Sequence, residues 1–317
     1  MFDTSKSFIR FGFSTSCFFN ILLIYLTAVH VTCFKGTYKF MILTFAVLCL
    51  VFDTAEVLSR PLIHNYNGSL FYLSLNTDLE PSGVVFYQYF IIIYGAMYTS
   101  VIAFVAVQFI FRYACIIKHQ TLLNSFNGHS RLFWFLAVIL PGVLFCVMCG
   151  VLIEPDEYSD NYIRQEAMDI YSRRIEEVPR LLMVVYDTNK NIRWRNTMFI
   201  FFEVTVMTVE YVIILFCAFN MHQNIQKELK NLSSRNQTLE NQFFRALLVQ
   251  ITLPTCFLTL PFIPIITIPL FDIKISYHST AFYSALSVYP AIDSIAMMLI
   301  VTEYRSCLKS KSRTWTD

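Results

Sequence analysis

Five acidic residues lie inside long apolar stretches of this chain, and they are the residues best placed to do chemistry. Asp53 and Glu56 are three positions apart, Glu203 and Glu210 are seven apart, and Asp293 lies near the C-terminal end. Both spacings place a pair of carboxyl groups on one face of a helix. A charged group at the centre of a spanning helix costs about 2.5–3.5 kcal/mol on insertion scales, so each acid should face a bundle interior or water.

Two roles are open for these acids. Asp53, Glu56, Glu203 and Glu210 could contact a small bound molecule in the outer half of a bundle. Each could instead be structural: Glu56 could pair with Arg60, four positions later, and the deeper acids could hydrogen-bond to hydroxyl groups. The candidate hydroxyl partners are Tyr211, Ser287 and Ser294. The residue types therefore predict a polar network, a ligand site or both.

Patterns typical of enzymes and metal sites do not occur in the sequence. It has no phosphate-binding glycine loop, no zinc-protease motif and no nucleophile elbow. The six histidines are scattered without the spacing of metal ligands. Cys146 and Cys149 form a C-x-x-C motif, but it lies in an apolar run without a second pair, which favours packing. We expect no enzyme activity, cofactor, metal site or nucleic-acid partner.

The elements that position the acids are seven apolar runs. A spanning helix needs about 20 mostly apolar residues, because each residue rises ~1.5 Å across a layer ~30 Å thick. The chain is 56% hydrophobic and 15% charged, against about 25% charged for a soluble domain. We therefore predict an all-α membrane protein, a seven-transmembrane helix bundle in a lipid bilayer. The predicted segments are 11–34, 38–58, 84–111, 132–153, 197–221, 243–271 and 280–301.

The positions of lysine and arginine predict the direction of the bundle. With the N-terminus outside, the inner side carries 13 of the 24 basic residues and the short outer segments carry 4. The remaining seven lie in a long outer loop, 154–196, and count little because long loops cross regardless of charge. The asymmetry predicts residues 1–10 outside and a cytoplasmic tail at 302–317.

Two positions are candidates for covalent modification. Asn67 begins an Asn-Gly-Ser sequon in the first predicted outer loop, where it could be glycosylated. Cys307 lies in the predicted tail, close to Lys309 and Lys311, and could be palmitoylated. The long outer loop contains no cysteine, so a disulfide cannot tie it to the third segment.

Prolines mark the segments best suited to move. Pro254 and Pro261 lie in the sixth predicted segment and Pro290 in the seventh. Each removes a backbone donor and crowds the preceding turn, so we expect kinks that concentrate bending at one place. Arg112 and Tyr113 end the third segment at the inner boundary, where a soluble partner could dock.

Several motifs together resemble the nematode serpentine chemoreceptors, within them the Str class and its Srj and Srd relatives. Gly36-Thr37-Tyr38-Lys39 is similar to that family's turn into segment 2, and Arg112-Tyr113 to its arginine motif. The run 242–250, which contains Arg245 and precedes Pro254 and Pro261, resembles the start of its segment 6. Tyr289-Pro290-Ala291-Ile292-Asp293, followed by Tyr304-Arg305, resembles its segment 7 signature and is the most specific of these matches.

The resemblance implies a G-protein-coupled chemosensory, or olfactory, receptor that binds an odorant or another small environmental chemical. It implies coupling to a heterotrimeric G protein at the inner face and a place in the plasma membrane, in the sensory cilium of a chemosensory neuron. The residues that match the family's inner and switch motifs are Arg112, Tyr113, Arg245, Pro254, Pro261, Tyr289, Pro290, Asp293 and Tyr304. Phe111 replaces the acid that precedes the arginine in rhodopsin-like receptors, so Arg112 has no acidic partner beside it in the chain.

A ligand-gated cation channel of the insect odorant-receptor kind is the alternative. Such a channel also has seven spans, but its N-terminus lies inside the cell. The position of the N-terminus therefore separates the two hypotheses. A transporter ranks third, because the two halves of the chain lack a matching pair of broken helices.

Overall fold

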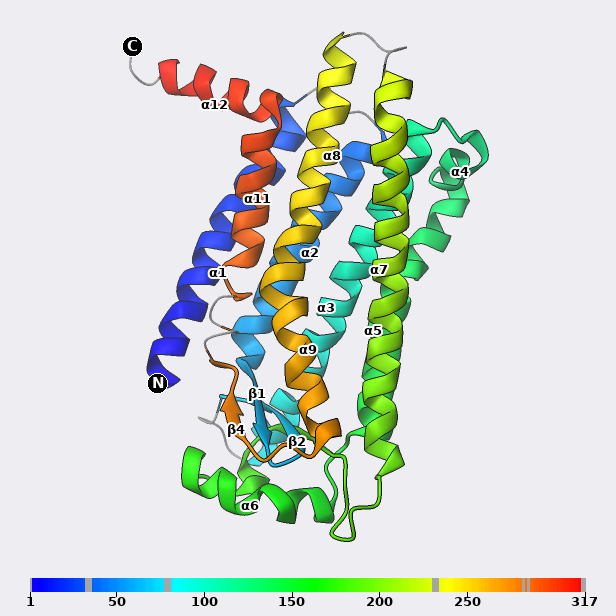
Figure 1. The fold of residues 1–317 in the computed structure, drawn as a ribbon. Helices are drawn as coiled ribbons and strands as arrows, with labels where there is room; N and C mark the ends of the chain where they lie inside the picture. Colours follow the sequence, from blue (N-terminus) through cyan, green and yellow to red (C-terminus); the bar gives the residue numbers. More distant parts are fainter. Residues whose placement is uncertain are drawn as a thin grey trace.

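The computed structural model describes residues 2–31, 36–76, 81–229, 234–280, 283 and 286–314. The predicted seven-helix bundle is confirmed (Figure 1). The end of the first predicted segment, parts of the seventh and the last residues of the tail lie outside the described residues. Within the described ranges, five helices are long and apolar enough to cross a membrane, and two shorter apolar helices, Leu260–Phe271 and Tyr289–Ile300, belong to segments six and seven.

The bundle consists of the following helices. Segments one to five are α1 (Phe2–Tyr25, continued by the π-helical turn Leu26–His30), α2 (Thr37–Ser59), α3 (Pro81–Ile116), α5 (Arg131–Leu152) and α7 (Trp194–Leu229). Segments six and seven are α8 (Ser234–Pro254) with α9 (Leu260–Thr267), and α11 (Tyr289–Ile300). Three shorter helices lie outside the bundle: α4 (Gln120–Ser125), α6 (Glu157–Tyr171) and α12 (Thr302–Thr314).

Several helices extend beyond the predicted apolar runs. The α3 and α7 helices both have 36 residues, and α8 begins nine residues before the run predicted at 243. Hydropathy detects only the part of a helix that lies in the hydrocarbon layer, whereas backbone hydrogen bonds continue into the polar region. The ends of these helices therefore project from the membrane.

Segment six is interrupted where the prolines predict. Pro254 ends α8, and the next five residues, Thr255–Thr259, form a π-helical turn, η4, before α9 begins. A proline cannot donate to the carbonyl one turn before it and crowds that carbonyl, so a wider turn relieves the contact. The kink predicted at Pro290 does not occur. This proline occupies the first turn of α11, where the missing donor costs nothing because that N–H has no helical partner.

The three loops predicted to lie outside, called the outer loops below, form a sheet that the sequence patterns did not indicate. Its four strands are β1 (Pro61–Tyr66), β2 (Ser69–Ser74), β3 (Arg180–Val184) and β4 (Ser276–His278), in the order β3-β2-β1-β4. All pairs are antiparallel. The first two strands belong to the loop after α2, β3 to the loop after α5, and β4 to the loop after α9. One sheet therefore joins all three outer loops.

The hairpin between β1 and β2 turns at Asn67 and Gly68. Both residues have positive φ, 42° and 79°, and Tyr66 pairs directly with Ser69. These features are those of a two-residue type I′ turn, which favours Asn-Gly because glycine and asparagine tolerate the left-handed region.

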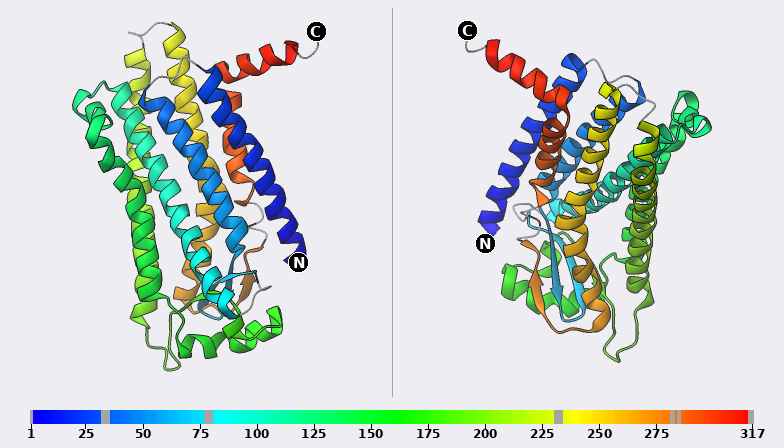
Figure 2. Two further views of the ribbon diagram at one scale, coloured as in Figure 1. Left: turned by 180° about the vertical axis from the view of Figure 1, so that it is seen from behind. Right: turned by 45° about the horizontal axis from the view of Figure 1, so that its top comes forward.

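The α6 helix covers the outer face of the sheet (Figures 1 and 2). Asp156 caps its first turn by accepting a hydrogen bond from the Ser159 amide, and Ser172 ends it in the left-handed conformation. Ile163 and Ala167 are fully buried against the sheet.

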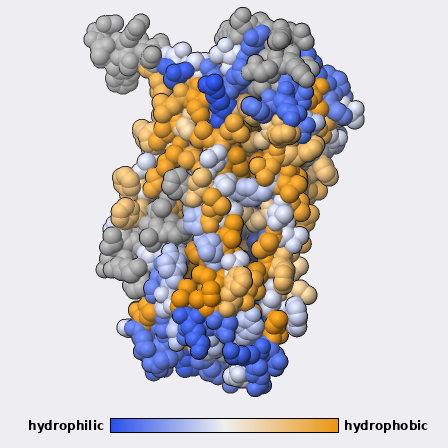
Figure 3. Space-filling model, viewed as in Figure 1, coloured by the Kyte–Doolittle hydropathy of each residue, from blue (hydrophilic) through white to orange (hydrophobic). Residues whose placement is uncertain are grey.

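The surface of the molecule has three zones along the bundle axis. Figure 3 shows apolar side chains in a broad middle zone and polar side chains at both ends. The sheet and α6 lie at one polar end, and α12 leaves the opposite end across the bundle axis (Figure 1). This distribution is that of a bundle crossing a bilayer.

Candidate functional site

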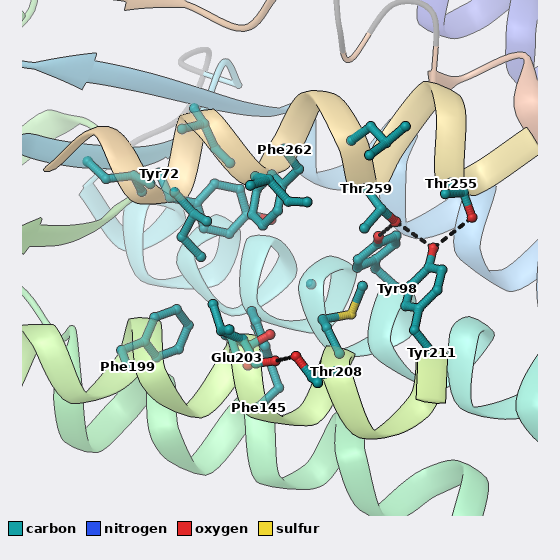
Figure 4. A pocket seen from close by; sticks show the side chains of 18 of the residues that line it. Tyr72, Tyr98, Phe145, Phe199, Glu203, Thr208, Tyr211, Thr255, Thr259 and Phe262 are labelled. Atoms are coloured by element: carbon teal, nitrogen blue, oxygen red, sulfur yellow. Dashed lines mark hydrogen bonds between the residues drawn. The ribbon is translucent and has the colours of Figure 1, made fainter. Parts of the chain in front are cut away.

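A cavity of about 510 Å³ lies in the half of the bundle nearest the sheet. Its walls come from α3, α5, α7, η4 and α9, and three strands form its roof. Cavities that bind small molecules commonly measure ~300–1,000 Å³ and are mostly apolar. The aromatic lining residues are Tyr72, Tyr94, Tyr98, Phe145, Phe199, Tyr211, Phe262 and Tyr283 (Figure 4).

A close approach between α3 and α5 forms one wall of the cavity. Gly95 has no side chain, and a Cβ atom at this position would lie 2.4 Å from the ring of Phe145. Both residues line the cavity. The glycine therefore allows the aromatic ring to pack directly against the backbone of α3.

Four acids were predicted to contact a ligand, and Glu203 is the one that lines the cavity. Its side chain projects from α7 into the space between α7 and α9 (Figure 4). The residue is 8% exposed, and its Oε1 atom has no hydrogen-bond partner among the described residues. A buried acceptor without a partner normally costs free energy, so it is a candidate contact for a ligand that donates a hydrogen bond.

Hydroxyl groups connect the cavity to the π-helical turn of segment six. The Tyr98 hydroxyl on α3 lies 3.2 Å from Thr259 Oγ1. The Tyr211 hydroxyl on α7 lies 3.0 Å from Thr255 Oγ1 and 2.7 Å from Thr259 Oγ1 (Figure 4). All four residues line the cavity. A molecule bound there would therefore touch both the turn and the groups that hold it.

Asp53 and Glu56 lie away from the cavity, in a polar network among α1, α2 and α11. Ser16 donates to Asp53, Asn20 donates to Ser16 at 2.9 Å, and Ser294 donates to Asn20 at 2.8 Å. Glu56 Oε1 accepts from Ser287 at 2.6 Å. Glu56 therefore bonds to Ser287 in place of the ion pair with Arg60 that the sequence suggested. The Arg60 guanidinium donates to the Leu75 carbonyl at 3.2 Å.

Glu210 and Asp293 occupy two further buried positions. Glu210 is 5% exposed, and both of its carboxyl oxygens lack a hydrogen-bond partner among the described residues. It is not among the residues that line the cavity. Asp293 is 2% exposed and accepts a hydrogen bond from Gln250 of α8 at 3.1 Å. Asp293 thereby links segments six and seven.

The inner end of α3 is joined to segment six through Arg112. Its Nη1 atom lies 2.9 Å from Glu240 Oε2 of α8. The guanidinium also lies over the rings of Tyr38 and Phe243, 3.7 Å and 4.5 Å from their centroids. Arginine favours such positions because its planar cation can stack and form an ion pair at once. Phe111 leaves Arg112 without an adjacent acid, and Glu240 supplies one from a distant part of the chain.

The other residues of the predicted inner and switch motifs have different environments. Tyr304 is fully buried, and its hydroxyl lies 2.7 Å from Thr27 Oγ1. Tyr289 is 4% exposed at the start of α11. Tyr113 is half-buried against Phe216. Arg245 is exposed on α8.

The two candidate modification sites lie at opposite ends of the molecule. Asn67 is half-buried in the hairpin turn, where its carbonyl accepts a hydrogen bond from Tyr162 of α6. Cys307 is half-buried on α12, which packs against the inner ends of α1 and α11. Glycosylation of Asn67 and palmitoylation of Cys307 stay predictions.

Glu240, Thr255 and Thr259 are functional candidates that sequence reasoning missed. A signal for Glu240 was present, since it is an acid on the same predicted side of the membrane as Arg112 and precedes segment six by three residues. The two threonines follow Pro254 at the point where a kink was predicted. A kinked helix exposes backbone carbonyls, and the hydroxyls nearest to it are natural partners.

Comparison with known proteins agrees with this architecture. The family model for the serpentine type 7TM GPCR chemoreceptor Str matches residues 5–309. The chain is 38% identical over 312 residues to the G-protein coupled receptor str-33 of Caenorhabditis elegans, an alignment that covers 96% of this chain and 90% of the relative. It is 25% identical over 279 residues to the serpentine receptor class r-10 of the same species, covering 85% and 80% of the two chains. This multi-pass membrane protein therefore belongs to the Str family of serpentine G-protein-coupled chemoreceptors.

Proposed function

We propose that this chemoreceptor binds a small chemical in the 510 Å³ cavity and transmits binding to a heterotrimeric G protein through segment six. The observation that carries the proposal is the shared position of Thr255 and Thr259. They line the cavity and also form the π-helical turn that separates the outer and inner parts of the segment. A ligand can shift the receptor only by binding its two states with different affinity. Contact with the turn supplies such a difference.

The inner end of segment six carries the group that must move. Glu240 holds Arg112 through an ion pair in which the arginine side chain is 6% exposed and the glutamate 30% exposed. A bend at the turn after Pro254 would displace α8 and separate the two charges. Arg112 and the neighbouring loops would then be free to meet a Gα subunit, as happens in switches built on a two-state element.

The direction of the bundle follows the charge asymmetry. We infer a plasma-membrane receptor with the N-terminus outside, the C-terminal tail in the cytoplasm and the cavity near the outer side. A sensory cilium would expose this side to environmental chemicals. Epitope tags at the N-terminus should be reached by antibody on intact cells; access only after permeabilisation would favour the channel alternative.

Substitutions of the ion pair test the transmission step without a known ligand. Glu240→Gln should raise basal nucleotide exchange on a promiscuous Gα subunit several-fold, because Arg112 loses its charged partner. Arg112→Ala should lower exchange to the background of cells without receptor. Glu303→Gln, another acid on the inner side, serves as the matched control and should behave as wild type at equal surface expression. Unchanged exchange in both ion-pair variants would refute this role for the contact.

A further inference from the structure

The cavity is closed toward the outer solution. The side chains that form its roof are Ile63, Leu70, Tyr72 and Met183, which are 4%, 6%, 7% and 1% exposed. They lie on one face of the sheet, since Ile63 pairs with Tyr72 and Leu70 pairs with Met183. The Tyr72 hydroxyl donates to the Ile91 carbonyl of α3 at 2.8 Å. The roof is therefore fastened to the bundle beneath it.

A second layer covers the roof. Asp160 of α6 forms a bidentate ion pair with Arg180 of β3, with N–O distances of 2.8 Å and 2.6 Å. Arg193 donates to Ser159 at 2.9 Å and pairs with Asp156. Bidentate pairs between arginine and a carboxylate are among the stronger polar contacts in proteins. A molecule arriving from outside would have to displace both the helix and the sheet.

The cavity opens instead between α7 and α9. Val204 and Val212 of α7 and Leu260 and Ile263 of α9 line it, although they are 45%, 59%, 56% and 49% exposed on the outside of the bundle. All four side chains are aliphatic, and α7, which carries two of them, crosses the apolar middle zone of the surface (Figures 1 and 3). The surface of that zone meets lipid acyl chains, so the gap between the two helices faces the hydrocarbon layer.

Inside the cavity, the polar groups open to a ligand are the carboxyl acceptor of Glu203 and the hydroxyl of Tyr94, which also lacks a hydrogen-bond partner among the described residues. Glu203 Oε1 is buried and has no hydrogen-bond partner among the described residues. The hydroxyls of Tyr98 and Tyr211 are already engaged with Thr259 and Thr255. The hydroxyls of Thr208 and Tyr72 donate to backbone carbonyls, and the rest of the lining is aliphatic or aromatic. These groups suit a molecule with an apolar body and one hydrogen-bond donor.

From these observations we propose that the ligand is a lipophilic molecule with one hydrogen-bond-donating group, which enters from the bilayer between α7 and α9 and donates to Glu203. This inference rests on the proposed use of the cavity as the ligand site. It adds a route and a chemical class. The route predicts that the concentration of ligand in the membrane, rather than in water, sets the rate of entry.

Time-resolved photolabelling tests the route. The full-length receptor in lipid nanodiscs is mixed with 3-azioctanol, a photoreactive alcohol, and irradiated after different delays; adducts on the interior residues Tyr94 and Tyr283 are then quantified by mass spectrometry. Val212→Trp places a bulky ring at the opening and should slow interior labelling at least fivefold. Val209→Trp is the matched control, because Val209 is 54% exposed on the same helix but does not line the cavity. It should label at the wild-type rate, and both variants should reach the same final extent.

Comparison with the methyl ether of the same probe tests the chemical class. The ether has the same apolar body but no donor, so the alcohol should compete for the cavity about five- to tenfold better in the wild type. Glu203→Leu should abolish this difference, whereas Glu203→Gln, which keeps a carbonyl acceptor, should retain part of it. Equal competition by alcohol and ether in the wild type would overturn the assignment of Glu203 as the acceptor.

The outcomes separate this inference from the proposed function. If interior residues are labelled at equal initial rates in Val212→Trp and Val209→Trp, entry between α7 and α9 is wrong while binding in the cavity stands. If the interior residues of the wild type are never labelled, the cavity is not a ligand site and both proposals fail. Basal G-protein activation by the Glu240 and Arg112 variants is measured without any probe, so the transmission step is judged on its own.

Discussion

The two acid pairs of the bundle have the same chemistry but different surroundings. Asp53 and Glu56 on α2 accept hydrogen bonds from Ser16 on α1 and from Ser287 in the turn before α11. Glu203 and Glu210 on α7 are also buried, and Glu203 Oε1 and both oxygens of Glu210 have no partner among the described residues, whereas Asp53 lacks one at Oδ1 alone. The difference arises because α1 and the turn before α11 each present a serine hydroxyl to α2. The walls around Glu203 are mainly aliphatic and aromatic.

This comparison separates acids that hold helices together from acids that weaken the fold. A carboxyl group with partners contributes to packing specificity, whereas one without partners costs stability. Proteins keep such costly groups mainly where they are used. Removal of a residue from each pair should therefore change stability in opposite directions, which the following predictions test.

The largest effect is expected at Asp53. Asp53→Leu should lower the free energy of unfolding by about 2 kcal/mol, because it removes the acceptor of Ser16 and leaves the proton of this buried hydroxyl without its partner. Unfolding of the purified receptor by SDS titration in mixed micelles measures this change. Asp53→Asn keeps an acceptor oxygen and should recover at least half of the loss. A fully stable Asp53→Leu variant would remove the distinction between the two pairs.

A histidine pair outside the membrane-spanning segments should make the free energy of unfolding depend on pH. Burial, and then the neighbouring imidazole of His278, lower the pKa of His64 to about 3; burial also lowers the pKa of His278. The groups facing the pair are Tyr171 at 3.1 Å and 3.4 Å, Glu166 at 3.3 Å and Ser276 at 3.0 Å. The cluster joins β1 and β4 to α6.

The sign of the pH effect follows from these positions. Unfolded histidine has a pKa of about 6.5, so below this pH the unfolded chain binds a proton that folded His64 does not accept until about pH 3. The stability should be constant above pH 6.5 and fall by up to ~1.4 kcal/mol per pH unit below it. His64→Phe should flatten this dependence in the same SDS titration at pH 7.5, 6.5 and 5.5. An equal slope in the variant would assign the effect to other groups.

An effect of opposite sign is expected at Glu210. Glu210→Leu should raise the free energy of unfolding by about 1 kcal/mol, since it removes two buried oxygens without partners among the described residues. Glu210→Gln, which keeps a polar amide, should give little or no gain. Destabilisation by the leucine substitution would show that Glu210 has a partner that stabilises the fold.

The smallest effect is expected at Glu56. Glu56→Gln should change stability by about 0.5 kcal/mol or less, because a glutamine carbonyl can still accept from Ser287. Ser287 also donates to the Tyr283 carbonyl at 3.1 Å, which limits the loss further. A decrease above 2 kcal/mol would mean that the negative charge of Glu56, rather than its acceptor oxygen, holds the segments together.

The approximate positions of the segments and the break in segment six could be predicted from the sequence, because both depend on local composition. Twenty apolar residues define a span wherever they occur, and Pro254 interrupts its helix regardless of the neighbours. The acids were also identified correctly as interior groups. Their separate roles were not accessible, because these depend on which helix faces each acid.

Long-range pairing accounts for what the sequence did not reveal. Asn67-Gly68 between two stretches rich in aromatic and aliphatic residues is a strong hairpin signal and could have predicted β1 and β2. The addition of β3 and β4 could not be predicted in this way, because their partners lie more than 100 residues away in the chain. The same holds for Arg112 and Glu240, which are separated by 128 positions.

The shared sheet has a consequence for chimeric receptors. Because each outer loop supplies only some of the strands, a single transplanted loop would bring hydrogen-bonding edges that fit its original neighbours and not its new ones. A register shift of one residue would turn Ile63 and Tyr72 away from the cavity. Exchange of ligand preference between relatives should therefore succeed only when all three loops are grafted as one unit.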